Sequence, residues 1–336
     1  MKKIIFKKAI ALLTSFVLVI SLCLTQAYAA VTTDGNPSNV GTLSDNTIYN
    51  YLNIRTYTLT LNGVTNSYPV EIFKSNPSTQ SGSPFFVSPA ATLVTLNIPN
   101  KTVIAKVNGN VQNGYGTVAQ VLGLGYFNGV FYQNGIWGQT AQKITSNISD
   151  LLEMDFQFFP CFVIKKPVQG STIKTATIRW FTKKTLADAL PSIDTIMPST
   201  NCLVYNGKSV FDQAVYDTSD GGLRIADGSD LTLKNSTLHN NPGTTVDSGK
   251  SGNNRTFLGH KQDGSFVMVV AGNMDFVSGA KLMVKLGCDY AVNLDGDGAS
   301  QMRVASGYTN NAPAGRIGSF GNDSYTYQSC FCIYNN

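Results

Sequence analysis

The amino-acid sequence predicts one α+β domain, built on a strand-dominated mixed sheet with a few short helices. Three observations support this fold class. Most apolar segments are short and alternate with polar residues, which is the pattern of strands rather than of helices. The 31 glycines, with many Asn and Ser residues, place turn signals between these segments. Charged residues make up only 13% of the chain, which fits an extracellular protein rich in strands and turns.

The chain begins with the pattern of a secretory signal peptide. Four lysines among the first eight residues precede an apolar run at 9–24 and the small-x-small cleavage site Ala27-Tyr28-Ala29. We expect cleavage after Ala29, which makes residues 1–29 a signal peptide. A retained membrane anchor is the alternative, but the apolar run is short and ends in a good cleavage site.

The net charge of the mature chain excludes some partners. The signal holds four lysines and no acidic residue, so its removal lowers the formal net charge from +5 to about +1. A nearly neutral protein is not expected to bind nucleic acid through a basic face. No later segment is long and apolar enough to span a bilayer, so we expect no membrane contact after signal removal. The predicted location is secreted, extracellular or cell-surface.

Cysteines and histidines do not form a recognisable catalytic or metal site. An odd number of cysteines follows the signal, so not all of them can pair with one another. The spacing does not match a zinc site, and we expect these residues to be structural or buried. His239 and His260 occur without a Gly-x-Ser-x-Gly motif, so a Ser-His-Asp hydrolase is not predicted. The five cysteines are Cys161, Cys202, Cys288, Cys330 and Cys332.

We expect residues 30–50 to form a flexible lead-in and residues 51–336 to form the domain, since no internal repeat or linker is visible. Asn62-Gly63 is a hairpin signal between predicted strands at 57–61 and 68–73. Residues 75–84 are rich in Ser, Pro and Gly and predict a loop. Further strands are predicted at 91–97, 101–108, 158–165 and 175–182.

Several other segments predict hairpins or short helices. Residues 115–138 are rich in glycine and aromatic residues, and they predict hairpins with turns at Asn128-Gly129 and Asn134-Gly135. Alternatively, aromatic faces in this segment could line a sugar site. The remaining predictions are a weak helical pattern at 144–154, a helical turn at 185–190, a hairpin at 202–210, and a polar connection at 220–251 that could be a lid or an insertion.

The most regular pattern begins at Arg255. Two predicted strands, at 256–259 and 266–271, flank a turn. After them, Ser278 can cap a short helix, and Gly287 is expected to end it. The remaining predicted elements are the turn at 262–264, the helix at 279–286 and strands at 290–294 and 325–334.

The segment after the strand at 290–294 is acidic and rich in glycine. Asp295 follows the strand, and Asn293 lies two residues earlier, on the same face of a strand. Gly296 and Gly298 permit positive φ and a close approach of backbone N–H groups to a ligand. With the Ser300 hydroxyl, these groups suit an oxygen-rich ligand such as a sugar or a phosphate.

Two other interpretations of this segment stay open. An Asp-Gly-Asp-Gly sequence is often only a hairpin or a solvated loop. Asp295 and Asp297 could instead hold a calcium ion, as in a calcium-stabilised surface protein; apart from this, the sequence predicts no metal and no cofactor.

A similar strand exit occurs upstream, where Asn108 and Gly109 end the predicted strand at 101–108. A second carboxylate could come from Glu153 or Asp155, which precede an apolar strand. Equally, these two residues could belong to a solvated helix end.

These residues together resemble the phosphodiester glycosidase family. The family pattern is an Arg-Thr-x-x-Gly strand followed by Asn-Leu-Asp-Gly-Gly-Gly-Ser, and here both the order and the spacing agree. Val107-Asn108-Gly109-Asn110 also resembles the family's Asn-Gly motif, though less closely. The matching residues are Arg255-Thr256-Phe257-Leu258-Gly259, then Asp263-Gly264 before an apolar strand and a helix, then Asn293-Leu294-Asp295-Gly296-x-Gly298-x-Ser300.

Two positions depart from the family pattern. Asp297 stands where the family usually has its middle glycine, and Asn110-Val111-Gln112 replaces a Phe-rich continuation. An extra carboxylate in the turn could change the preferred substrate charge, recruit a cation or reduce activity.

The resemblance implies a hydrolase that cleaves the bond between a sugar and a phosphate in a glycosyl-1-phosphodiester of the cell envelope or of extracellular glycans. It implies Asp295 as the catalytic carboxylate and Arg255 as the phosphate-binding residue. The alternative is a non-catalytic protein that binds carbohydrate or cell wall on the same fold. The residues expected to bind or orient substrate are Asn108, Gly109, Asn293, Gly296, Gly298 and Ser300.

Overall fold

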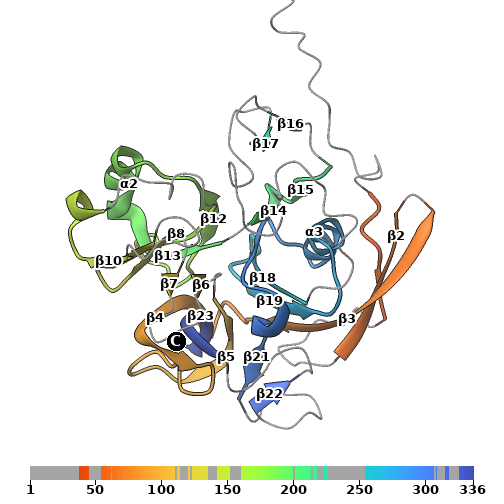
Figure 1. The fold of residues 1–336 in the computed structure, drawn as a ribbon, viewed down its shortest axis with the longest axis horizontal. Helices are drawn as coiled ribbons and strands as arrows, with labels where there is room; N and C mark the ends of the chain where they lie inside the picture. Colours follow the sequence, from red (N-terminus) through yellow and green to blue (C-terminus); the bar gives the residue numbers. More distant parts are fainter. Residues whose placement is uncertain are drawn as a thin grey trace, which may run out of the picture.

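The structure is a computed structural model of residues 1–336, and Figure 1 shows the fold. It describes residues 38–44, 54–61, 63–109, 112–113, 120–121, 123–134, 142–151, 160–199, 201–212, 215–217, 223–225, 254–305, 308, 315–317 and 325–336. The predicted signal peptide, most of the lead-in and most of the connection at 220–251 lie outside these residues, as do Asn110, Glu153, Asp155 and His239.

The largest sheet has eight strands and is antiparallel throughout the described pairings. Its order is β1-β2-β3-β19-β18-β20-β14-β15. In chain order the strands are β1 (Thr42–Leu43), β2 (Ile54–Leu61), β3 (Val64–Lys74), β14 (Asn201–Tyr205), β15 (Lys208–Ser209), β18 (Arg255–His260), β19 (Phe266–Ala271) and β20 (Tyr290–Asn293).

A five-stranded sheet contains the end of the chain. Its order is β22-β21-β5-β23-β4. The strands are β4 (Gln80–Thr92), β5 (Val103–Asn108), β21 (Met302–Val304), β22 (Gly315–Ile317) and β23 (Thr326–Asn335).

A six-stranded sheet has the order β10-β9-β8-β13-β11-β12. Its strands are β8 (Gly123–Phe127), β9 (Val130–Asn134), β10 (Gln142–Thr145), β11 (Cys161–Lys165), β12 (Ala176–Arg179) and β13 (Ile193–Pro198). Two small pairs join β6 (Gln112–Asn113) to β7 (Gln120–Val121) and β16 (Val215–Asp217) to β17 (Leu223–Ile225). The helices are α2 (Lys183–Ala189), α3 (Phe276–Lys285) and the short η1 (Ile148–Asp150), η3 (Leu190–Ser192) and η4 (Asp297–Ala299).

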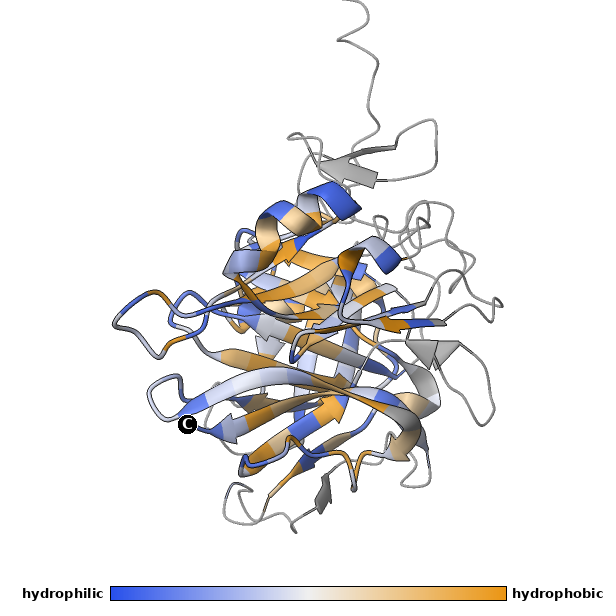
Figure 2. Cartoon of the chain, turned by 90° about the vertical axis from the view of Figure 1, so that its left-hand side faces the viewer, coloured by the Kyte–Doolittle hydropathy of each residue, from blue (hydrophilic) through white to orange (hydrophobic). Residues whose placement is uncertain are grey.

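The eight-stranded sheet, the five-stranded sheet and α3 form layers that enclose one core. On one side of the eight-stranded sheet, α3 lies beside β18 and β14 (Figure 1). A Cβ atom on Gly279 of α3 would lie 2.5 Å from the Phe257 ring, so helix and sheet pack closely. From the five-stranded sheet, Phe331 packs on Phe266 of the larger sheet, with ring centroids 5.3 Å apart. Figure 2 shows hydrophobic residues concentrated on the central strands, as this packing requires.

The prediction of a strand-dominated protein with few short helices is confirmed. The sheets differ from the mixed sheet that the sequence predicts. Every described strand pairing is antiparallel, and the strands are distributed over three main sheets. No helix in the part of the chain that the structure describes combines the length and the apolar character needed to cross a membrane.

Several predicted strands and turns are also present. The predicted hairpin joins β2 to β3, where Leu61 pairs with Val64 and Gly63 has a φ of 80°, while Asn62 lies outside the described residues. Asn206 and Gly207 turn between β14 and β15 with positive φ at both residues, as a type I′ turn requires. The turn at Asn128-Gly129 joins β8 to β9 in the same way.

Two predictions in the region before β5 are wrong. Residues 80–84 belong to β4 rather than to a loop, because Gly82 lets β4 pass close to Phe331, where a Cβ atom would lie 2.6 Å from the ring. Residues 93–97 form a loop rather than a strand. This loop buries Leu93 and Leu96, and the Lys106 ammonium holds its carbonyl groups.

The predicted helix at 144–154 is wrong over its described part. Residues 142–145 are the strand β10, which pairs with β9, and only the single turn η1 is helical. At the helix α3, the capping residue is Asp275 instead of Ser278. The Asp275 carboxylate accepts a 2.7 Å hydrogen bond from the Ser278 backbone N–H, so the helix begins three residues earlier. Gly287, with a φ of 78°, follows the helix end as predicted.

Candidate active site

The end of β5 and the turn after β20 are joined directly. The Asn108 side-chain Nδ2 donates a 2.9 Å hydrogen bond to the Asp295 carbonyl oxygen, and the Asp295 backbone N–H donates a 3.0 Å bond to the Gly109 carbonyl. Both backbone groups of Asp295 are therefore fixed by the strand exit that lies 187 residues earlier. The structure thus brings together three of the predicted site residues from opposite halves of the chain.

Asn108 also joins this turn to two further segments. Its Oδ1 atom accepts a 2.7 Å hydrogen bond from Thr256 Oγ1 and a 3.0 Å bond from the Gln301 backbone N–H. A second, longer bond runs from Nδ2 to the Gly109 carbonyl, at 3.3 Å. An asparagine amide has two N–H donors and two acceptor lone pairs, so these bonds use its full capacity. Asn108 is completely buried, which suits a residue that positions its neighbours.

Arg255, the first residue of β18, lies against the same turn. Its side chain is only 2% exposed. Its Nε donates a 3.1 Å hydrogen bond to the Met274 carbonyl, and its guanidinium carbon lies 4.2 Å from the centroid of the Phe276 ring. These two contacts at the start of α3 orient the guanidinium group. A Cβ atom on Gly296 would lie 3.7 Å from Arg255 Nη1, so the arginine adjoins the residue that follows Asp295.

Gly296 is required for its small size rather than for an unusual backbone conformation. A Cβ atom there would lie 2.8 Å from the Asn254 carbonyl oxygen, which is too close for any side chain. Neither Gly296 nor Gly298 has a positive φ, so this turn does not use the left-handed conformation that glycine permits. Gly298 lies in η4, is exposed, and has open space around its Cα.

Asp295 is 9% exposed, and its carboxylate stays close to its own turn. Its Oδ1 accepts a 2.9 Å hydrogen bond from the Gly296 backbone N–H. The N–H of Ala299 bonds the Gly296 carbonyl at 3.0 Å, which closes the single helical turn η4 behind the carboxylate. A carboxylate on such a short, internally bonded turn keeps a defined position.

Two serine hydroxyls are buried beside these residues. Ser300 and Ser329 are both 0% exposed, and neither Oγ atom makes a hydrogen bond to the described part of the chain. Ser329 lies beneath Gly109, where its Oγ occupies the space of a Cβ atom, and its carbonyl accepts a 2.9 Å bond from the Gly109 N–H. Buried hydroxyls without partners cost free energy, so both are candidates for contact with a ligand.

Asn293 ends β20 next to these groups. Its Nδ2 donates a 2.7 Å hydrogen bond to the Leu294 carbonyl, and the side chain is 2% exposed. In the sheet, Asn293 pairs with Phe257 on one side and with Asn201 on the other. Asn201 is buried as well, and nothing in its sequence context indicates that it adjoins this region.

Thr256, Gln301 and Ser329 were not identified from the sequence as members of this site. Thr256 follows Arg255 within the Arg-Thr pattern, so that pattern was the available signal. Gln301 takes part through its backbone, and Ser329 comes from β23 near the end of the chain; neither has a local sequence signal.

Of the other residues that the sequence analysis discussed, the structure describes the side chain of His260. His260 lies at the far end of β18, packs on Phe266 with ring centroids 5.2 Å apart, and has a pKa lowered by burial. The side chain of Asp297 lies outside the described part of the structure, as do Glu153 and Asp155. Among the described residues, no three His, Cys, Asp or Glu side chains are grouped so that they could hold a metal ion.

The chain is similar in sequence to one protein family and in fold to several solved structures. Residues 175–323 match the family described as phosphodiester glycosidase, a segment that includes Arg255 and Asp295 but not Asn108 or Ser329. A solved structure with a similar fold is the catalytic domain of zebrafish N-acetylglucosamine-1-phosphodiester α-N-acetylglucosaminidase, auto-inhibited by its pro-peptide. The TM-score is 0.51 at 12% identity, and the match covers 92% of this chain and 97% of the zebrafish chain.

Two bacterial structures show weaker similarity. A hypothetical protein from Synechocystis has a TM-score of 0.47 at 11% identity, covering 85% of this chain and 62% of that chain. A Burkholderia pseudomallei protein described as exported has a TM-score of 0.42 at 12% identity, covering 80% and 74%. A search of curated proteins gives no match in sequence.

Proposed function

Since the chain resembles the phosphodiester glycosidase family over residues 175–323, we propose that it is a secreted hydrolase acting on sugar-1-phosphodiesters of the cell envelope or of extracellular glycans. The observation that carries this proposal is the position of Arg255 against Gly296, the residue that follows Asp295. Arg255 on β18 and Asp295 in the turn after β20 thereby lie on adjoining elements, which supports a role for the first with phosphate and for the second with the sugar.

Arg255 is proposed to bind the phosphate of the substrate. Guanidinium groups form strong, charge-assisted hydrogen bonds with phosphate oxygens, often two at once. The bond from Nε to the Met274 carbonyl and the contact with the Phe276 ring fix the plane of the group. Nη1 lies on the side of Gly296. A phosphate bound to this guanidinium would therefore lie beside the acidic turn, residues 295–300.

Asp295 is proposed as the catalytic carboxylate. A phosphate monoester is a good leaving group, so the reaction needs little acid assistance. It does need a carboxylate that stabilises an oxocarbenium-like transition state or activates a water molecule. In the overall reaction, the bond between the anomeric carbon and the phosphate oxygen breaks. Water supplies the new hydroxyl at the anomeric carbon, and its second proton passes to the departing phosphate oxygen or to solvent, so the products are a free sugar and a phosphate monoester.

The remaining residues are proposed to hold the substrate or the turn. The backbone groups of Gly296 and Gly298 and the Ser300 hydroxyl would donate hydrogen bonds to substrate oxygens. Asn293 and Gly109 would contact the substrate at the strand exits. Asn108 has no hydrogen-bonding capacity left, so we assign it to positioning Asp295 rather than to substrate binding.

One observation favours a second candidate function, a carbohydrate-binding protein without catalysis. Asp297 replaces a glycine of the family pattern and places a second negative charge in the turn that would receive a phosphate. Repulsion between this charge and the substrate phosphate would oppose turnover.

A sugar-release assay distinguishes the two candidates. The full chain is incubated with a synthetic N-acetylglucosamine-1-phosphate methyl diester, and with glucose and galactose analogues, while free sugar is measured. The hydrolase proposal predicts release that Asp295→Asn lowers by about 10²- to 10⁴-fold, while Asp188→Asn on the exposed surface of α2 leaves it unchanged. Saturable glycan binding without release from any diester would favour the binding protein. Equal release by the Asp295 variant would refute the assigned role.

A further inference from the structure

Two cysteines lie side by side in the last strand of the chain. Cys330 and Cys332 are two residues apart in β23, so their side chains leave the strand on the same face. Both are thiols in this structure, and their Sγ atoms lie 3.4 Å apart, within hydrogen-bonding distance of each other. Both residues are 0% exposed. Two thiols are therefore held in contact inside the protein.

The spacing of these cysteines meets the geometric requirement for a disulfide. Residues two apart in a strand have Cα atoms about 6.4–6.8 Å apart, and bridging without backbone movement is excluded only beyond about 7 Å or when the Cβ atoms point apart. The sulfur atoms need to come closer by roughly 1.4 Å to reach bonding distance. The register of β23 shifts on either side of the pair, with β4 next to Ser329 and with β5 next to Ile333, so the strand can absorb this local adjustment.

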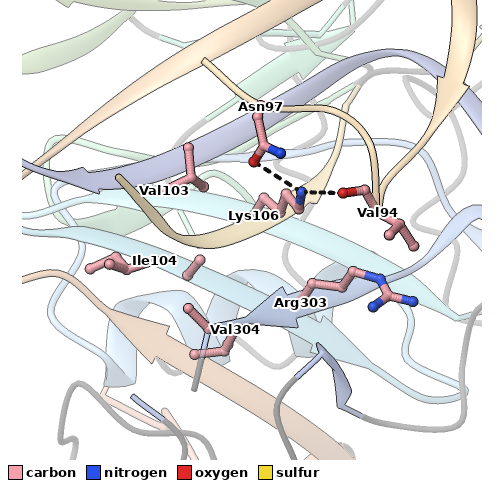
Figure 3. A pocket seen from close by; sticks show the side chains of 9 residues that line it. Val94, Asn97, Val103, Ile104, Lys106, Arg303 and Val304 are labelled. Atoms are coloured by element: carbon pink, nitrogen blue, oxygen red, sulfur yellow. Dashed lines mark hydrogen bonds between the residues drawn. The ribbon is translucent and has the colours of Figure 1, made fainter. Parts of the chain in front are cut away.

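A loop covers the face of the sheet on which the two thiols lie. Lys106 of β5 pairs in register with Cys332. Its Nζ donates hydrogen bonds to the carbonyls of Val94 and Leu96, at 3.0 and 2.7 Å, and to Asn97 Oδ1, at 3.2 Å. Figure 3 shows the bonds to Val94 and Asn97. Leu96 belongs to the same apolar cluster as both cysteines, so this loop shields the thiols from solvent.

The folded thiols are expected to react slowly with an oxidant. Burial raises the pKa of the Cys330 thiol well above its usual range, and the hydrogen bond with Cys332 acts in the same direction, while the charge of Lys106 opposes both. Because the thiolate is the nucleophile in thiol–disulfide exchange, the pair is protected once the loop has closed. Oxidation therefore belongs to the folding chain, before β23 takes its place between β4 and β5.

We propose that Cys330 and Cys332 are joined by a disulfide that forms while the chain folds in an oxidising compartment. One thiolate attacks a disulfide-bearing oxidant and gives a mixed disulfide, from which the second thiolate displaces the remaining thiolate of the oxidant. The cysteine pair loses two protons and two electrons, and the disulfide of the oxidant is reduced to two thiols. An exported chain, which the signal pattern predicts, meets such oxidants outside the cytoplasm.

This bond would brace the strand against which the acidic turn packs. The two cysteines share their apolar cluster with Ala299 of η4. Tyr327 of the same strand donates a 2.7 Å hydrogen bond to the Ala299 carbonyl, and Cys330 pairs in register with Asn108. A crosslink restricts the unfolded chain and so stabilises the folded state. The proposal does not depend on the hydrolase activity, since the disulfide needs no substrate.

Peptide mapping of the refolded full chain tests the pairing. Trypsin cleaves after Arg316, and the resulting peptide 317–336 contains Cys330 and Cys332 but no other cysteine. The chain is unfolded, refolded with reduced and oxidised glutathione, and alkylated with iodoacetamide in denaturant before digestion. We expect this peptide to carry no alkyl group and to be lighter than the dithiol by two hydrogen atoms.

Three other cysteines serve as internal controls in the same digest. Cys161, Cys202 and Cys288 each lie in a tryptic peptide of their own and should be alkylated. The proposal is refuted if Cys330 and Cys332 carry alkyl groups or glutathione, or if either is linked to another cysteine.

Thermal melting tests the bracing role. Reduction of the unfolded parent protein, followed by refolding in reductant, should lower its Tm by at least about 2 °C. Cys202→Ala, which changes a buried cysteine in β14, should show the same fall on reduction. The double variant Cys330→Ala/Cys332→Ala should show none. Equal Tm values for the oxidised and the reduced parent protein would refute the bracing role.

Discussion

The side-chain amide of Asn108 donates a 2.9 Å hydrogen bond to the backbone carbonyl of Asp295, across 187 residues of the chain. Through its other bonds, Asn108 also holds Thr256 and Gln301. One buried amide therefore connects β5, β18 and both ends of the acidic turn. The position of the Asp295 carboxylate depends on this connection, and the predictions below test it together with the neighbouring contacts.

Replacing Asn108 should destabilise the protein and reduce activity together. Asn108→Ala leaves the Asp295 carbonyl, the Thr256 hydroxyl and the Gln301 N–H without their partner. Because buried polar groups without partners are costly, we expect the free energy of unfolding to fall by about 2–4 kcal/mol. Urea denaturation followed by circular dichroism measures this. Asn66→Ala, at an exposed position in β3, serves as the control and should change stability little; a similar loss in both variants would contradict the role of Asn108.

Arg255→Lys should retain the positive charge but lose the fixed geometry. A lysine cannot donate from an Nε–H to the Met274 carbonyl, nor can it present two parallel donors to a phosphate. We expect kcat/KM for a sugar-1-phosphodiester to fall about 10- to 100-fold, with the folded structure retained. Steady-state kinetics on the purified variant gives the value, and Arg179→Lys is the matched control. Unchanged kcat/KM would show that the geometry of this guanidinium is not needed.

The two glycines of the acidic turn should respond differently to alanine. At Gly296 the new Cβ would lie 2.8 Å from the Asn254 carbonyl oxygen, so the backbone must move and carry Asp295 with it. At Gly298 there is open space and no positive φ, so alanine should be accepted. We expect Gly296→Ala to lose at least about 1 kcal/mol of stability and most activity, and Gly298→Ala to stay within about 0.5 kcal/mol of the parent protein. Thermal melts and the sugar-release assay compare them; equal effects would be inconsistent with the steric argument.

Tyr68 should make the protein less stable at high pH. It is buried, and its hydroxyl donates a 3.1 Å bond to the Asp275 carboxylate and shares a 3.0 Å bond with Ser278. Burial raises the pKa of Tyr68 to about 12. The unfolded chain loses the phenol proton near pH 10, so the folded state binds more protons between these two values. This contribution to stability is complete below about pH 10 and is lost as the pH rises toward 12.

We therefore expect the free energy of unfolding of the parent protein to fall between about pH 10 and pH 12. In Tyr68→Phe, which has no phenol proton, the fall should be smaller, although the variant is less stable at neutral pH because it lacks the two hydrogen bonds. Urea titrations at several pH values measure both slopes. Identical slopes would exclude Tyr68 as the titrating group.

The local pattern of the sequence was sufficient to predict those elements whose cause is local. The turn at Gly63, the positive-φ turn at Asn206-Gly207 and the helix end at Gly287 each follow from the conformational preference of one or two residues. The predictions that are wrong concern segments whose conformation is decided by distant residues. Gly82 belongs to a strand because Phe331 packs on it, and residues 93–97 form a loop that Lys106 holds.

In the candidate active site, too, some features could be predicted from the sequence and others only from the tertiary structure. By itself, the sequence determined which residue types are present: an arginine that starts a strand, and an acidic, glycine-containing turn that ends another. Only the tertiary structure decided that Arg255 lies against this turn, that Asn108 fixes Asp295, and that Ser329 lies beneath Gly109. The physical reason is that these contacts join strands of two sheets. Backbone preferences act between near neighbours in the chain, whereas pairing and packing of sheets act between residues that the chain places far apart.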